Sequence, residues 1–184
     1  MLGRWLTGRS VDRDWVELAA ISPALPAAVI ASEDARFCQH GGVDWAALNE
    51  VLEDAEEGGP SRGASTVSMQ VAKNVFLWPG RSYLRKALEI PLALLLDLAW
   101  GKQRTIEIYL NVAEWGDGVF GAEAAARRHF RKSARDLTRG EAALLASALP
   151  NPIRRNPSRP SARQRATAAT VAARIPDTPL GCLR

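Results

Sequence analysis

Two acidic residues, Glu33 and Asp34, end an apolar stretch that the sequence predicts to be a helix. The helix macrodipole places partial negative charge at a C-terminal end, so acidic side chains there cost stability. A carboxylate kept in such a place is a candidate general base. The plainer interpretation is a surface ion pair with the nearby Arg36, and this segment by itself leaves both interpretations open.

The turn after this helix carries His40, one of two histidines in the chain. A lone histidine in a turn is more often a hydrogen-bonded structural residue than a catalyst, so we expect a structural role. A metal site lacks partners, because the other histidine, His129, is far along the chain and no second ligand follows at helical spacing. The sequence therefore predicts no metal ligands.

A second candidate segment begins at Gly63 and opens a helix at Ser65 and Thr66. Polar side chains recur on one face of this helix, at Thr66, Gln70, Lys73 and Asn74. The N–H groups of a helix start can hold an anion, although the spacing of a phosphate-binding P-loop is absent. The alternative is an ordinary amphipathic helix with a polar outer face.

A third segment surrounds one acid with cations. Glu89 follows Arg85 by four residues and Lys86 by three, and Arg81 continues the same helical face. A surface ion pair of this kind contributes only about 0.2–1 kcal/mol. As a site, the segment is a clamp for a diphosphate, because arginine suits bidentate phosphate contacts and lysine supplies a point charge.

Taken together, Glu33 and Glu89 suggest glycosyl chemistry, which commonly uses two carboxyl groups. The cations around Glu89 indicate that the leaving group is a phosphate rather than a sugar hydroxyl. The residues therefore favour transfer from a phospho-activated sugar over simple hydrolysis.

The elements that would position these residues are helices. Alanine, the best helix former, occurs 31 times and few segments alternate apolar and polar residues. A capping-box spacing of Thr138 and Glu141 marks one helix start, and Pro91 is expected to kink its helix or to be packed within it. We expect no strand and about eight helices, over residues 23–34, 45–57, 66–77, 82–100, 102–113, 120–130, 139–149 and 162–174.

Length and charge limit the classes of protein. A chain of 184 residues is long enough for one domain with its own core. The net charge of +4 is unevenly spread: residues 1–126 hold 11 basic and 17 acidic side chains, and residues 127–184 hold 13 and 3. A basic C-terminal region suggests a polyanionic neighbour, either nucleic acid or an anionic membrane surface. The alternative is that these charges only keep the protein soluble.

Compartment and membrane signals are sparse. Cys38 and Cys182 are too few for a disulfide framework or a zinc site, and they are compatible with a reducing compartment or with an oxidising one on which the fold does not rely. No segment reaches the ~18 apolar residues of a membrane span, and we expect no signal peptide. We expect a chain that starts soluble, either without an anchor or with an upstream anchor removed.

Five stretches, in order, resemble the motifs of the peptidoglycan glycosyltransferases, glycosyltransferase family 51. They are residues 33–42, 63–74, 85–89, 102–111 with Gly116, and 124–130. Two further runs, 74–82 and 114–121, are closer still to the monofunctional biosynthetic branch of the family. The resemblance covers about residues 14–175. We expect no penicillin-binding Ser-x-x-Lys domain to follow, as in the monofunctional type.

This resemblance implies a single all-α domain, with a lysozyme-like head and a smaller membrane-facing jaw at about residues 75–102. It implies lipid II and the growing glycan chain as substrates, the membrane surface as a partner, and no nucleic acid. The implied place is the periplasmic face of the inner membrane, where division or elongation machinery is a further candidate partner. We expect the family's N-terminal transmembrane anchor to be absent from this chain. The resemblance requires no cofactor, although a divalent cation can assist the diphosphate.

Site residues follow from the same resemblance. Glu33 matches the general base, which deprotonates the acceptor's 4-hydroxyl for attack on the anomeric carbon of the donor with inversion. Glu89 matches the second acid, which organises the leaving undecaprenyl diphosphate. The family's cationic phosphate contacts match Lys73, Arg81 and Lys86, and the residues that line the cleft match Ser65, Gln70 and Asn74. One departure is Met69, where the family usually has glutamine, and this change predicts lost polar contacts.

Three alternatives stay open from the sequence. A lysozyme-like enzyme that cuts glycan would leave the cations around Glu89 unexplained, and it would shorten the product instead of lengthening it. A basic binding module would leave both acids idle, and its duplex binding would depend steeply on salt. A catalytically impaired scaffold protein would follow if the loss of a glutamine at Met69 disables the site.

Overall fold

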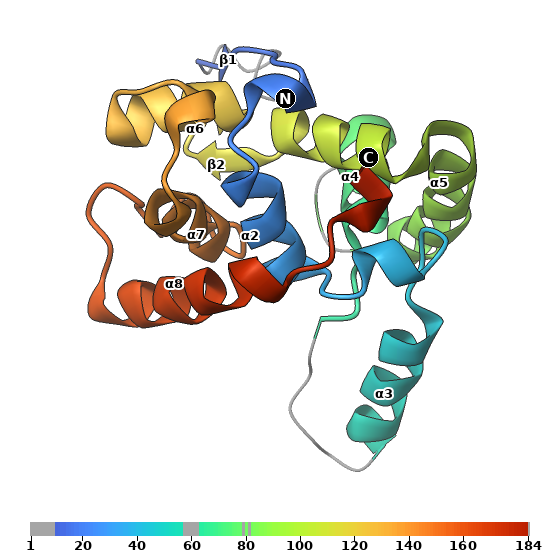
Figure 1. The fold of residues 1–184 in the computed structure, drawn as a ribbon. Helices are drawn as coiled ribbons and strands as arrows, with labels where there is room; N and C mark the ends of the chain where they lie inside the picture. Colours follow the sequence, from blue (N-terminus) through green and yellow to red (C-terminus); the bar gives the residue numbers. More distant parts are fainter. Residues whose placement is uncertain (1–9, 57–62, 79, 81, 184) are drawn as a thin grey trace.

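The computed structural model describes residues 10–56, 63–78, 80 and 82–183 (Figure 1). Within these ranges the chain is predominantly helical, as expected. The α-helices are α2 (Ala24–Glu33), α3 (Trp45–Glu56), α4 (Val67–Phe76), α5 (Tyr83–Val112), α6 (Ala122–Phe130), α7 (Arg139–Ala148) and α8 (Ala162–Arg174). Short 3₁₀ helices lie at Leu18–Ala20, Phe37–Gln39, Ala134–Asp136, Ile175–Asp177 and Gly181–Leu183.

The expectation of no strand was wrong. A small sheet joins β1 (Asp12–Arg13), β3 (Val119–Phe120) and β2 (Glu114–Gly116) in that order. β1 runs parallel to β3, and β2 runs antiparallel to it. Strands of two or three residues are too short to show alternation in a sequence, so pattern reasoning could not detect them.

Helix α2 lies at the centre of the molecule (Figure 1), packed against α7 and α8. Every residue from Leu25 to Ala31 is buried. A helix that is apolar all round belongs in a core, where neighbours cover every face. Glu33, the last residue of α2, is therefore held at the end of a fully packed helix.

Helix α5 is two helices joined at a bend. The bend is at Gly101, whose φ of 69° and ψ of 177° are non-helical, whereas Pro91 lies inside the first half. The break between the two predicted helices is thus confirmed, but its cause is glycine geometry that other residues rarely adopt. The first half packs beside α4, and the second half enters the core through residues such as Ile106 and Leu110.

The two cysteines are joined in a disulfide between the 3₁₀ helices at 37–39 and 181–183. The pair lies 144 residues apart in the sequence, with Cα atoms 5.5 Å apart. One bridge is no framework, yet the fold does use it, and it favours the oxidising of the two compartments considered above. The C-terminal segment is thereby tied beside the loop that follows α2.

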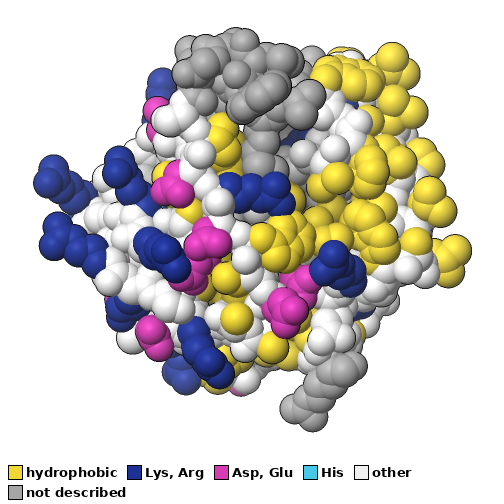
Figure 2. Space-filling view, turned by 90° about the horizontal axis from the view of Figure 1, so that it is seen from above, with side chains coloured by type: hydrophobic (Ala, Val, Ile, Leu, Met, Phe, Trp, Pro, Cys, Tyr) yellow, Lys and Arg dark blue, Asp and Glu magenta, His cyan; other side chains and the backbone are white. Residues whose placement is uncertain are grey.

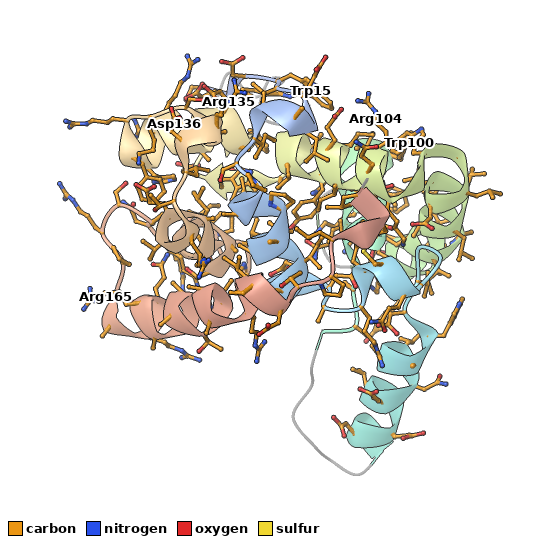
Figure 3. All side chains as sticks on the ribbon, viewed as in Figure 1. Trp15, Trp100, Arg104, Arg135, Asp136 and Arg165 are labelled. Atoms are coloured by element: carbon orange, nitrogen blue, oxygen red, sulfur yellow. A yellow bond between two sulfur atoms is a disulfide. The ribbon has the colours of Figure 1, made fainter. Side chains whose placement is uncertain are left out.

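Side chains attach the N-terminal segment to α5. Arg104 of α5 stacks over the Trp15 ring at 5.6 Å, and the two side chains meet at one edge of the molecule (Figure 3). The amide of Asn111 also bonds with the backbone of Val16, at 2.9 and 3.0 Å. Among the described helices, none is long and apolar enough to cross a bilayer.

Candidate functional site

Glu33 is the last residue of α2, and its side chain is half-buried. Its Oε2 accepts a hydrogen bond from the side-chain nitrogen of Gln70 at 3.0 Å. Arg36 does not form the surface pair considered from the sequence, since it pairs with Asp44 at 2.8 Å and with Glu50 at 3.6 Å. The carboxylate of Glu33 is therefore held by a neutral donor, which suits a group that must accept a proton.

Asp34 connects the end of α2 to the start of α4. One carboxylate oxygen lies 2.8 Å from His40 Nε2, and the other accepts a bond from the Val67 backbone N–H at 2.9 Å. Thr66 caps the same helix by accepting from Met69 N, and its hydroxyl donates to the Gly42 carbonyl at 2.6 Å. These buried bonds fix α4 beside Glu33, and His40 takes the structural role expected of it.

Asp34, His40 and Asp44 have ligand atoms within 4.8 Å of one another, which makes them a metal-like cluster among the described residues. Their oxygens, however, already have partners. Asp44 caps α3 through Ala47 N at 3.0 Å and pairs with Arg36. Burial by itself raises the pKa of Asp44, but the hydrogen bonds from Ala47 and Arg36 and the charge of Arg36 outweigh it and lower the pKa. The cluster acts as a structural joint between α2, α3 and α4.

Lys73 lies on the polar face of α4, half-buried. Burial lowers the pKa of Lys73, and the positive charges of Arg85 and Lys86 act in the same direction. The carboxylates of Glu89 and Glu33 oppose that shift. Lys73 is thus within electrostatic reach of both acids.

Glu89 is buried in the first half of α5, with 3% of its surface exposed. It forms ion pairs with Arg85 and, at 3.2 Å, with Lys86. The Lys86 ammonium also donates to Ser65 Oγ at 2.6 Å. The structure therefore brings Ser65, which lies just before α4, together with Lys86 and Glu89 of α5. Glu89 orients two cations while it stays out of solvent.

Three other residues that the sequence analysis singled out lie in different surroundings or outside the described residues. Asn74 is exposed in the last turn of α4. Arg81 lies outside the described residues, so its predicted phosphate contact stays a prediction. Met69 is buried with Val43 and Ala93. Its side chain belongs to the core rather than to the polar face of α4.

Tyr109 is a site residue that the sequence analysis did not single out. Its buried hydroxyl donates to the side-chain oxygen of Gln70 at 3.2 Å. Burial, together with the charge of Glu33, raises the pKa of Tyr109 well above its ordinary value of 10. The sequence could have indicated this role, because Tyr109 lies on the apolar face of the helix that begins after Gly101. A tyrosine buried on that face needs a hydrogen-bond partner for its hydroxyl.

A polar cavity of about 320 Å³ opens beside Glu33. Its lining includes Glu33, Arg36, Ser65 and Arg174. A larger hollow of about 560 Å³ beside α8 contains none of the predicted site residues. The smaller cavity is the better place for a sugar hydroxyl, because there it would meet the candidate base.

Comparison with known proteins gives consistent matches along the chain. Residues 2–175 match the family described as Transglycosylase. A protein of Nitrobacter hamburgensis called biosynthetic peptidoglycan transglycosylase is 56% identical over 175 residues, which are 95% of this chain and 77% of the relative.

Two more relatives carry the same name. The protein of Rhodospirillum centenum is 59% identical over 90% of this chain and 71% of its own length. That of Brucella suis is 56% identical over 90% of this chain and 74% of its own length. Because the family match runs through every segment that builds the site, the chain belongs to the transglycosylase family.

Proposed function

We propose that this chain is a peptidoglycan glycosyltransferase that polymerises lipid II into β-1,4-linked glycan strands, with inversion and release of undecaprenyl diphosphate. The relatives' name, biosynthetic peptidoglycan transglycosylase, supports the reaction class. The observation that carries the proposal is the placement of Glu33: a half-buried carboxylate at a polar cavity, within electrostatic reach of the cation Lys73.

The proposed step uses both acids differently. Glu33 takes the proton of the acceptor's 4-hydroxyl, and that oxygen attacks the anomeric carbon of the donor sugar. The bond from this carbon to the diphosphate oxygen breaks, and its electron pair leaves with the diphosphate. Lys73 and Lys86 offset the negative charge that develops there, and Glu89 keeps Lys86 and Arg85 in position through its ion pairs.

The site favours synthesis over cleavage of glycan. A hydrolase acting on neutral sugar chains has no use for cations organised by a buried acid, whereas a departing diphosphate needs them. The buried position of Met69 also argues against an impaired scaffold, because the polar face of α4 keeps Gln70 and Lys73. We place the reaction at the periplasmic face of the inner membrane, with division or elongation machinery as a candidate partner.

The test is a Glu33→Gln variant incubated with labelled lipid II, with the products separated by size. We expect loss of polymerisation with an unchanged fold, because an amide cannot accept the proton. Glu53→Gln is the matched control, since Glu53 is an exposed acid on α3. Glycan chains of normal length from the Glu33→Gln variant would refute the assignment of the base, and shortening of finished glycan by the parent enzyme would favour a hydrolase.

A further inference from the structure

The core side of α5 reaches the site through the phenol of Tyr109. The side chain is 1% exposed, and its hydroxyl donates to Gln70 Oε1 at 3.2 Å. The amide nitrogen of the same Gln70 donates to Glu33 Oε2 at 3.0 Å. A chain of two hydrogen bonds therefore runs from the core, through one amide, to the proposed base.

The tyrosine determines which way the amide faces. A glutamine can turn either its NH2 group or its oxygen toward a carboxylate, and only the NH2 group stabilises the charged form. The phenol donates to the amide oxygen, which leaves the NH2 group for Glu33. Because burial and the charge of Glu33 keep the phenol protonated, with its pKa well above 10, Tyr109 remains a donor at any working pH.

We propose that Tyr109 is a positioning residue that acts through Gln70 to hold Glu33 ionised and ready to accept a proton. Without the hydroxyl, the amide is free to turn its oxygen toward a protonated Glu33. The base is then lost at a higher pH than in the parent enzyme. This inference rests on the proposed function, because it needs Glu33 to be the base.

Among the described residues, the Tyr109 hydroxyl bonds to Gln70 alone, so its removal breaks no hydrogen bond or ion pair of the other charged groups around Glu33. From α4, Lys73 interacts with Glu33 through its charge alone. Asp34 stays bonded to His40 and to the start of α4. The remaining charged groups that line the cavity are Arg36, Asp44, Glu50 and Arg174. A changed pH profile in a tyrosine variant therefore reports on the path through Gln70.

The experiment compares Tyr109→Phe with Thr105→Val in lipid II polymerisation, with kcat and KM measured across pH. Thr105 is one helical turn earlier in α5, and its buried hydroxyl has no hydrogen-bond partner among the described residues. We expect the acid limb of kcat in Tyr109→Phe to move up by about 0.5–1 pH unit, the effect of one ordinary hydrogen bond. KM should be unchanged, and Thr105→Val should not move the limb.

A second pair of variants tests the route. Gln70→Leu should move the acid limb in the same direction at least as far, and adding Tyr109→Phe to it should move the limb no further. Thermal melts verify that each variant is folded. If Tyr109→Phe does not fold, an unmoved acid limb in Gln70→Leu still overturns the proposal. An unmoved limb in folded Tyr109→Phe, or an equal shift added to Gln70→Leu, overturns the proposal.

The two proposals fail differently. Continued polymerisation by Glu33→Gln would remove the proposed base, and with it the basis for any role of Tyr109. An inactive Glu33→Gln together with an unmoved acid limb in Tyr109→Phe would remove the role of Tyr109 alone.

Discussion

Lys73 connects the two halves of the proposed mechanism, because both Glu33 and Glu89 act on its charge. Its ammonium is partly withdrawn from water, so it has lost some of the hydration that would compete with a phosphate. Among the described residues, neither acid forms an ion pair with Lys73, whereas Glu89 is paired with Arg85 and Lys86. We therefore expect Lys73 to be the cation that meets a substrate's phosphate group.

Replacing Lys73 with alanine is expected to lower kcat/KM for lipid II by about tenfold to a hundredfold, the range of one charge-assisted hydrogen bond. Lys132→Ala is the control, because Lys132 pairs with Glu141 instead, at 3.0 Å. The measurement is initial polymerisation rate against substrate concentration. An unchanged kcat/KM in Lys73→Ala would exclude Lys73 from the clamp.

The pH dependence of activity gives a second test of the role of the Lys73 charge. Burial lowers the pKa of this lysine, so its charge is lost at a lower pH than that of a free lysine. Activity that depends on the charge is present below that pKa and falls as the pH rises through it. In Lys73→Arg the guanidinium stays charged, so the alkaline limb of kcat/KM should move to higher pH. A limb at the same pH in both proteins would contradict this.

At the scale of elements, helix starts were predictable because local side chains set them. Thr138 and Glu141 form the capping box that their spacing predicted, and Asp44 caps α3 through Ala47 N. Such bonds span three residues or fewer, so the sequence contains all the information that they need.

Long-range contacts could not be predicted in this way. The path from Tyr109 through Gln70 to Glu33 joins residues 39 and 37 positions apart. The polar face of α4 was visible in the sequence, but the partner of each residue on it depends on how α2, α4 and α5 pack. The same holds for the disulfide, which needs two distant segments to meet.

The bend of α5 at Gly101 is an element-scale feature with a direct test. Its φ of +69° favours glycine, although a Cβ there would meet no atom within 4 Å. Gly101→Ala is therefore expected to cost about 1–3 kcal/mol of unfolding free energy through backbone strain alone. Urea unfolding measures the change.

Gly140→Ala is the matched control for this substitution. Gly140 lies within α7, and a Cβ there would also meet no atom within 4 Å. Alanine is the better helix former, so this variant should gain up to about 1 kcal/mol. Equal effects of the two substitutions would show that the bend imposes no strain on residues with a side chain.

At the scale of the whole molecule, exposed apolar side chains are concentrated on one side. Exposed large side chains gather on the end of α4 and on α5 (Figure 2). We call this the apolar patch: Phe76, Trp78, Leu84, Leu88, Leu94, Leu95 and Leu98. Contiguous exposed apolar surface of this kind marks a contact site. It falls in the predicted jaw, next to the residues of the proposed diphosphate clamp.

We expect the apolar patch to bind bilayers. The double variant Leu95→Glu with Leu98→Glu should reduce co-sedimentation with liposomes at least tenfold. Transfer of each leucine side chain out of water contributes about 1.5–3 kcal/mol of binding free energy, which the variant loses. The control is Ile153→Glu, since Ile153 is 63% exposed but lies in the connector between α7 and α8. Equal loss of binding in the control, or no loss in the double variant, would show that another surface binds the membrane.

The disulfide acts on the molecule as a whole, because Cys38 and Cys182 enclose most of the chain between them. Cys38 lies five residues after Glu33, so the bridge secures the loop that leaves the site against the C-terminal segment. Closing so long a loop removes many conformations from the unfolded chain, and reduction is expected to cost about 2–4 kcal/mol of unfolding free energy. Urea unfolding with and without a reductant measures this, with mass spectrometry to verify reduction. The double variant Cys38→Ser with Cys182→Ser should have the same unfolding free energy as the reduced parent, and adding the reductant should not change it. Equal stability of the reduced and oxidised parent would mean that packing alone holds the C-terminal segment in place.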